Sequence, residues 1–424
     1  MNDFMYADPA TLEGQLQRGR GLGAHSALAA PGAADLVYEC VITDSRWDRQ
    51  TEHRDSYLAR LVHRLDLPLA PIERHLFAHD DDDPQEVEPA LQVLALLPFV
   101  GRVDAVSVLR RYAIEGRHWA SALEAIGWGG GWKISGVWTG LDEDVIARRD
   151  DAQLAAHTAG GEPWTSWART QPRIRRILDE RTSRRSGRMV RPPDPRSCVE
   201  LSAAELVGLI GADTSRDRRS ALQELSRRGD LVVLDLAEDV GLRNAAGWTP
   251  GMPQALNHLG AAAVARARTW TRSGDATLEQ LAVGVLSDFG DRDDYPYLLN
   301  ELTSATAAGA WCAAESPAKG LGRLRIAEAT DALVHAWETT VHSYAREAFL
   351  EGLRGCAPDT ADNYAVEGLD DCEPCVQQAA SAAAPDTAYV RTRLRELCDD
   401  PLAPEIHEAV RQRLMQLTVS GSAR

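Results

Sequence analysis

The sequence predicts an all-α fold in which two-helix units stack as an α-solenoid. Three observations lead to this prediction. The chain of 424 residues is rich in Ala, Leu, Arg and Glu and only 6% aromatic, a composition that favours helix over strand. Apolar residues recur at helical spacing along most of its length. In the second half of the chain, this helical pattern itself repeats at nearly constant intervals.

The repeat is clearest after residue 201. Equivalent positions in successive first helices, at intervals of 34, 35, 33 and 28 residues, are Val264, Leu298, Leu333, Val366 and Leu394. A period near this length with two helices in each unit is typical of an α-solenoid. The stretch 291–299 sets the register, because the turn Gly290-Asp291 ends one apolar helix and the next apolar run begins directly after it.

Composition divides the chain into four predicted regions. Residues 1–33 show little periodicity and are expected to form an N-terminal arm, either loose or with one short helix. Helical repeats follow at 34–160, with a Trp/Gly-rich insertion at 127–138. An Arg- and Pro-rich segment at 161–200 connects them to a C-terminal repeat array at 201–424, whose first helix begins at the capping box Ser202-Ala203-Ala204-Glu205.

Residues 329–353 carry the most regular unit, in which Val341 leads a second helix with paired Ala345 and Ala348. This unit resembles the short bacterial form of the HEAT-repeat family, and the resemblance is clearest over 276–417. It implies a curved stack whose concave face binds another macromolecule. The chain departs from the family pattern where His342 replaces the usual Arg after the leading Val, and where Pro317 interrupts the second helix expected at 311–324.

The Trp/Gly-rich insertion is the first candidate binding feature. Its tryptophans, Trp128, Trp132 and Trp138, lie among five glycines, which oppose a stable helix and favour a loop or small hairpin. Exposed tryptophans would form a surface for docking a partner. Buried tryptophans would instead fill the joint between two helical halves, which is the more usual fate of large aromatic side chains.

Arginines are concentrated at 169–196. This segment contains ten arginines and three acidic residues, which give it a formal charge of +7. Candidate binding residues in this segment are Arg173, Arg175 and Arg176. The segment has two interpretations. Its arginines contact phosphates or an acidic partner, or they are neutralised by acidic loops of the same chain, such as 80–83. The net charge of −17 disfavours broad nucleic-acid binding.

The polar run 44–54 also has two interpretations. On a helix, Asp44, Asp48 and Glu52 would share one stripe with basic residues beside it. Such a ladder could face a ligand. Alternating charges are more often a solvated helix face or a turn leading into a helix, and this is the expectation for 44–54.

Other patterns predict no cofactor and no metal. Cys372-Glu373-Pro374-Cys375 has CxxC spacing, but it lacks the second ligand pair of a zinc site and the strand-to-helix context of a redox motif. A single His-Glu pair, His407-Glu408, argues against an iron hydroxylase built from similar repeats. Residues 1–30 lack the pattern of a signal peptide, and no apolar run reaches the ~18 residues of a membrane span, so a cytoplasmic protein without a membrane partner is expected.

These observations lead to two hypotheses about function. The first is a non-catalytic adaptor that binds a protein partner on its concave face, with 127–138 as a specialised part of that surface. The alternative is an enzyme acting on nucleic acid, similar to DNA glycosylases built from HEAT-like repeats, with the arginines of 169–196 contacting phosphates.

Overall fold

The computed structural model describes residues 5–49, 51–78, 83–128, 137–158, 160–186, 198–211 and 215–422. Within these ranges every regular element is a helix and no strand occurs, so the predicted all-α class is confirmed. None of the described helices combines the length and the apolar character that crossing a lipid bilayer requires.

Contacts divide the chain into two units. Unit 1 comprises Met1–Val190, Val341–Tyr344 and Tyr364–Arg424, and unit 2 comprises Arg191–Thr340 and Ala345–Asn363. This division differs from the boundaries expected from composition, because the last part of the predicted C-terminal array packs with the N-terminal helices.

Unit 1 contains the first twelve α-helices and the last three: α1 (Leu12–Gln17), α2 (Gly21–Ala29), α3 (Ala33–Ile42), α4 (Asp55–Arg64), α5 (Ala70–Ala78), α6 (Glu88–Leu96), α7 (Asp104–Glu115), α8 (Trp119–Trp128), α9 (Leu141–Ala147), α10 (Asp151–His157), α11 (Trp164–Thr170), α12 (Pro172–Ser186), α24 (Pro374–Ala383), α25 (Ala388–Cys398) and α26 (His407–Ser422). Its short 3-10 helices are η1 (Pro84–Glu86), η2 (Leu97–Val100) and η9 (Pro404–Ile406).

Unit 2 contains α13 (Ala203–Gly211), α14 (Ser215–Arg227), α15 (Val232–Glu238), α16 (Met252–Leu259), α17 (Val264–Trp270), α18 (Ala276–Phe289), α19 (Tyr295–Ala307), α20 (Trp311–Leu324), α21 (Thr330–Thr339) and α22 (Arg346–Cys356). Its short 3-10 helices are η4 (Val240–Leu242), η5 (Gly260–Ala263), η6 (Arg292–Asp294) and η7 (Ala327–Ala329). Two further elements cross the division between the units, namely η8 (Ser343–Ala345) and α23 (Pro358–Gly368).

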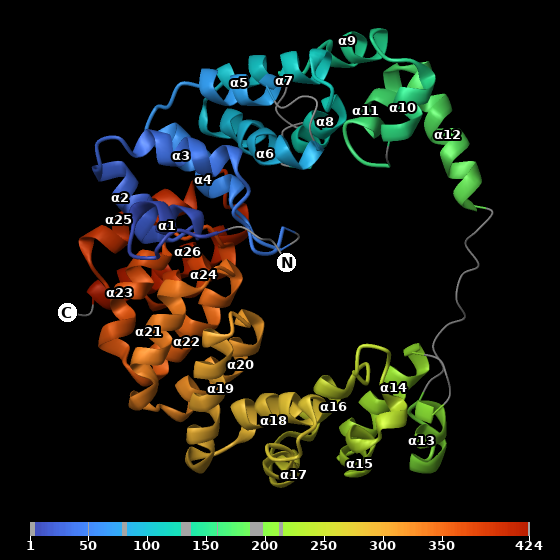
Figure 1. Cartoon of the computed structure of the whole chain (residues 1–424), viewed down its shortest axis with the longest axis vertical. Helices are drawn as coiled ribbons and strands as arrows, with labels where there is room; N and C mark the ends of the chain where they lie inside the picture. Colours follow the sequence, from blue (N-terminus) through green and yellow to red (C-terminus); the bar gives the residue numbers. More distant parts are fainter. Residues whose placement is uncertain are drawn as a thin grey trace. The chain divides into compact units, whose positions relative to one another are not determined.

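Helices of unit 2 pack in two rows that follow the chain (Figure 1). The even row contains α14, α16, α18, α20 and α22, each in contact with the next. Helices α17, α19 and α21 each pack against the following member of the even row. The five positions aligned by the sequence repeat lie in α17, α19, α21, α23 and α25, so the predicted period marks alternate helices.

Unit 1 has a comparable arrangement. Helices α4, α6 and α8 pack in succession, and so do α3, α5, α7 and α9. The row α4–α6–α8 is called here the even row of unit 1. Apolar residues from both rows form its core, with Val62, Leu94 and Leu123 among the fully buried side chains of the even row.

The acidic turn at 291–294 joins successive helix pairs in unit 2. Asp291 caps η6 and shares a capping box with Asp294, whose side chain is buried. Arg268, in the last turn of α17, donates to both carboxylates at 2.6–2.9 Å. Arg243 binds Asp275 before α18 in the same way, at 2.8–3.0 Å. The turn acids are therefore structural partners of arginines that precede them in the chain.

Glycines allow α20 and α22 to approach closely. A methyl group on Gly355 would lie 2.0 Å from the carbonyl oxygen of Gly322, and one on Gly322 would lie 2.7 Å from the Cα of Gly352. Helix α20 runs from Trp311 to Leu324 despite Pro317, which is buried inside it. The second helix expected at 311–324 is therefore present.

The segment predicted as an N-terminal arm is helical and well packed within unit 1. Arg20 forms a buried, bidentate ion pair with Glu367 at 2.8 and 3.0 Å. The carbonyl of Gly19 accepts a hydrogen bond from the amide of Cys372, and a methyl group on Gly21 would lie 1.9 Å from the Glu367 carbonyl oxygen. The periodicity of a sequence indicates local helices only. It could not predict the packing of this segment, which depends on residues some 350 positions away in the chain.

The close approach of α20 and α22 predicts a large cost for Gly355→Ala. The new methyl group would overlap backbone atoms of Gly322 that cannot move without separating the two helices, so unfolding free energy should fall by about 1–3 kcal/mol. Urea denaturation followed by circular dichroism measures the change. Gly208→Ala in α13 is the control, because its methyl group meets open space and should stabilise the helix by up to about 1 kcal/mol. Equal effects of the two substitutions would contradict the account of the α20–α22 contact.

Candidate functional site

Of the three candidate tryptophans, the structure describes the side chain of Trp138 alone. Trp138 is buried, with 5% of its surface exposed, and belongs to the core of unit 1. Trp132 and the side chain of Trp128 lie outside the described residues. Nearby, Trp164 contacts both Trp119 and Trp167 edge to face, with ring centroids 6.1 and 5.3 Å apart. The tryptophans described here fill the core, and Trp138 offers no surface to a partner.

The candidate arginines lie on α12 and contact their own unit. Arg173 donates to the carbonyl oxygens of Ile146 and Arg149 at 2.8 and 2.7 Å, and Asp151 pairs with both Arg173 and Arg176. Arg175 donates to the carbonyls of Ala168 and Arg169, which belong to α11. These contacts favour neutralisation within the chain, with Asp151 as the acidic partner. Residues 79–82 lie outside the described part of the chain.

The polar run 44–54 leads into a helix, which is one of its two expected forms, but two of its charged side chains are buried. Residues 43–49 and 51–54 form an irregular connection before α4, and Glu52 and Arg54 are 3% and 5% exposed. Their charges are therefore not solvated. A helix here would have placed them on a solvent-facing stripe, but the loop turns both side chains toward segments that lie almost 300 residues later in the sequence.

Glu52 is held by hydrogen bonds to both of its oxygens. Oε2 accepts from the amides of Trp47 and Asp48, and Oε1 accepts from the amide of Ser343 at 2.7 Å. The Nδ1 atom of His342 lies 2.9 Å from the same Oε1. Burial alone would raise the pKa of Glu52, but the His342 bond, the charge of Arg54 and the Ser343 amide lower it to about 2. Because an ionised carboxylate can only accept, Nδ1 of His342 carries the shared hydrogen.

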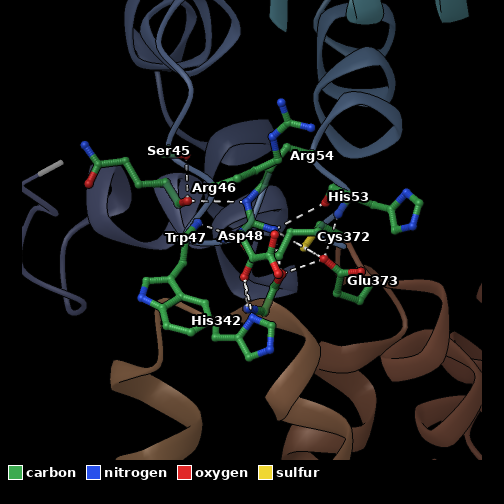
Figure 2. A network of polar contacts seen from close by, with 12 residues as sticks. Ser45, Arg46, Trp47, Asp48, His53, Arg54, His342, Cys372 and Glu373 are labelled. Atoms are coloured by element: carbon green, nitrogen blue, oxygen red, sulfur yellow. Dashed lines mark hydrogen bonds and ion pairs between the residues drawn. The ribbon is translucent and has the colours of Figure 1, made fainter. Parts of the chain in front are cut away.

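Arg54 connects this carboxylate to a second one (Figure 2). Its Nη1 atom donates to the Ser343 hydroxyl and to the Cys372 sulfur, each at 2.8 Å, and lies 3.5 Å from Glu373. The Ser343 hydroxyl donates in turn to Oε1 of Glu373 at 2.5 Å. Burial raises the pKa of Glu373, against the opposing charge of Arg54 and the bond from Ser343.

These side chains include a thiol, a hydroxyl and an imidazole, but their arrangement does not suit catalysis. Ser343 is fully buried, and the Cys372 residue is 1% exposed. The Ser343 hydroxyl donates to Glu373 and Nδ1 of His342 binds Glu52, so these hydrogen bonds tie the hydroxyl and the imidazole to two different carboxylates. A cavity beside Arg54 and Cys40 measures about 10 Å³, enough for about one water molecule.

The network is called here the buried clamp: Glu52, Arg54, His342, Ser343, Cys372 and Glu373.

A larger concave site lies on the even row of unit 2. It is a groove of about 610 Å³ over α18, bounded by α16 on one side and by α19 and α20 on the other. This volume falls in the range of ligand-binding pockets, about 300–1,000 Å³. The lining is called here the α18 groove: Trp248, Pro253, Gln254, Leu256, Asn257, Ala276, Glu279, Gln280, Leu281, Val283, Gly284, Val285, Asp288, Phe289, Glu301, Ala305, Cys312, Ala313 and Ser316.

The α18 groove combines an apolar floor with negative charge. Its carboxylates are Glu279, Asp288 and Glu301, and none of the described residues that line it is Lys, Arg or His. Asp288 is exposed and accepts a hydrogen bond from Asn257 of α16 at 2.7 Å. Burial, and then the charges of Glu301 and Glu279, raise the pKa of the neighbouring Tyr297. The described lining of the groove therefore has three carboxylates and no cation.

A smaller groove on the even row of unit 1 has the same character. It measures about 180 Å³, lies between α4, α6 and α8, and is lined by Asp55, Glu88 and Glu124 together with Gln92, Leu96, Ser121 and Ala125. None of its described lining residues is basic. Burial, and then the charge of Glu124, raise the pKa of Glu88. The charges of Arg46 and Arg49 oppose this shift, so basic residues act on the smaller groove although they do not line it.

Sequence reasoning missed the α18 groove, although part of its signal was readable. Glu279, Gly284 and Asp288 lie on α18 at intervals of five and four residues, within a helix rich in apolar residues. Gly284 is the informative residue, because a glycine inside a helix costs about 1 kcal/mol relative to Ala and a methyl group on it would meet no atom within 4 Å. No family model, curated protein or solved structure matches the chain.

The pKa of Glu52 predicts how stability depends on pH. Because the folded-state pKa lies below the ordinary value of 4.5, its ionised form stabilises the fold by about 3 kcal/mol above that value, and this contribution is lost as the pH falls toward 2. Glu52→Gln should lower the unfolding free energy at pH 7, and the difference from wild type should shrink by about 1 kcal/mol between pH 6 and pH 4. Urea titrations at each pH measure it. A pH-independent difference would contradict the role of the carboxylate.

The buried clamp also predicts strong coupling between Arg54 and Glu373. Arg54→Met leaves a buried carboxylate without its cation and should cost about 3–5 kcal/mol of unfolding free energy. The double variant Arg54→Met/Glu373→Gln should be more stable than the sum of the two single changes, which a double-mutant cycle measures. Arg411→Met, which breaks the exposed pair with Glu408, is the control and should cost less than about 1 kcal/mol. Strict additivity at Arg54 and Glu373 would exclude the proposed coupling.

Proposed function

We propose that this chain is a non-catalytic helical-repeat adaptor whose α18 groove binds a protein partner. The observation that carries the proposal is the groove itself, a concave surface of about 610 Å³ with an apolar floor and three carboxylates. Protein interfaces are centred on buried apolar contacts with polar groups at the rim, and the lining of the groove has this composition. The nucleophiles of the buried clamp have no comparable access, which favours binding over catalysis.

The proposed architecture is an α-solenoid of HEAT-like repeats. The alternation of helices in two rows supports it, and so does the sequence period that marks α17, α19 and α21. In such a stack, one row of second helices lines the binding surface. Both acidic grooves lie on even rows, as this architecture expects of a binding face.

The alternative, an enzyme acting on nucleic acid through the arginines of 169–196, has weaker support. Phosphate binding requires basic side chains that can displace the counterions of the nucleic acid. Arg173 and Arg176 instead pair with Asp151, and Arg175 donates to backbone carbonyls. The two even-row grooves carry the charge sign that repels a phosphate backbone.

Charge reversal in the groove tests the adaptor. The full chain is immobilised and used to capture proteins from an extract of its source cells, with quantification by mass spectrometry. Asp288→Arg/Glu301→Arg should reduce the capture of a specific partner at least about ten-fold, a change of about 1.4 kcal/mol. Glu328→Arg/Asp331→Arg is the matched control, since both residues are exposed in unit 2 outside the groove lining.

The same assay separates the two functions. Arg173→Ala/Arg175→Ala/Arg176→Ala should leave the partner bound, and the wild-type chain should show no salt-dependent affinity for duplex DNA. A partner that survives the groove reversal, or a duplex affinity that falls steeply with salt and disappears in the arginine variant, would overturn the adaptor proposal.

A further inference from the structure

We propose that the occupant of the α18 groove is a cationic, apolar segment of the partner, in which a large apolar side chain is flanked by Lys or Arg. This inference rests on the proposed function and specifies the chemistry of the partner. It is carried by the charge complementarity of the groove and by the composition of its floor.

The carboxylates that line the groove determine the charge expected of the occupant. Glu279, Asp288 and Glu301 come from two helices and line one groove without a basic neighbour among the described lining residues. Other acids of unit 2 are paired with arginines: Asp235 and Glu238 bind Arg266, and Asp291 binds Arg268. An acidic or neutral ligand would leave the groove carboxylates uncompensated, whereas Lys or Arg would satisfy them.

The apolar part of the occupant follows from the floor. Trp248 and Phe289 line the groove together with Leu281 and Val283, and Gly284 lies among them. Because a methyl group on Gly284 would meet no atom within 4 Å, α18 presents bare backbone and open space there. A side chain such as Leu or Trp could enter this space and bury its surface at about 25 cal/mol per Å² of apolar area.

A second copy of the chain is a poor occupant. Its most basic helix is α12, whose apolar residues Ile174 and Ile177 are 0% and 7% exposed. They would have to leave the core of unit 1 to enter a groove. With a net charge of −17, two copies also repel each other.

Cys312 provides a reporter of occupancy. It is exposed at the edge of the α18 groove, whereas Cys40, Cys198, Cys356 and Cys372 are buried. Alkylation of Cys312 by iodoacetamide can be followed peptide by peptide with mass spectrometry. Cys398 in α25 of unit 1 is half-buried and serves as the internal control, because occupancy of the groove should not change its rate.

The probe is a short synthetic peptide in which a leucine and a tryptophan are flanked by lysine pairs. At saturation it should slow alkylation of Cys312 at least about five-fold and leave Cys398 unchanged. Two further peptides, one with serines for the apolar residues and one with glutamates for the lysines, should each bind at least about ten-fold more weakly by calorimetry, about 1.4 kcal/mol. Equal binding of the serine peptide or of the glutamate peptide would overturn the proposal.

Variants place the peptide in the groove. Gly284→Phe fills the open space on α18 and should abolish protection of Cys312, whereas Gly208→Phe on α13, also facing open space, should preserve it. Absence of protection by the lysine peptide in the wild-type chain refutes the cationic, apolar occupant. If partner capture still depends on Asp288 and Glu301 in that case, the adaptor function stands with a partner of different chemistry. If capture is also indifferent to the groove, both proposals fail.

Discussion

Two buried carboxylates around one guanidinium hold three separate stretches of unit 1 together. Glu52 and Arg54 come from the loop before α4, His342 and Ser343 from the short segment after α21, and Cys372 and Glu373 from the turn before α24. An ionised carboxylate in this setting is stable only while each of its partners is present, because burial of an unpaired charge is expensive. The buried clamp thus requires the N-terminal loop and the C-terminal helices to be folded against each other.

This requirement gives the chain a topology that a simple linear stack lacks. In a linear solenoid each repeat contacts its neighbours alone. In unit 1 the residues that join α1 and α2 instead contact residues 367–372, which precede α24. Arg20 pairs with Glu367, and the amide of Cys372 donates to the carbonyl of Gly19. Further contacts between the two ends of unit 1 lie outside the clamp, among them Arg60 with Asp400 at 2.6 Å and His25 with Asp370 at 2.7 Å.

The acidic residues of unit 2 differ in whether an arginine is bound to them. Turn acids such as Asp275, Asp291 and Asp294 are bound by arginines that precede them in the chain. The carboxylates of the α18 groove have no basic residue beside them among the groove's described lining. A net charge of −17 therefore says little by itself, and the informative quantity is the charge that remains after internal pairing.

Local features of the fold could be predicted from the sequence. The Ser202–Glu205 capping box begins α13 with both of its hydrogen bonds present, and the repeat period marks α17, α19 and α21. These signals depend on residues a few positions apart. The buried clamp could not be predicted, because a polar run such as 44–54 has the same composition whether it faces water or a distant segment. The α18 groove was missed for a related reason, since its lining comes from helices whose lateral positions are set by packing.

Hydrogen–deuterium exchange of the full chain with and without the lysine-flanked peptide tests the central claim most directly. An occupant of the α18 groove would protect backbone amides of α16, α18 and α20, because it would stabilise the helices that it contacts. The account predicts slower exchange in these three helices and unchanged exchange in α12. Protection confined to helices of unit 1, such as α12, would contradict it, since the binding surface would then lie outside the α18 groove.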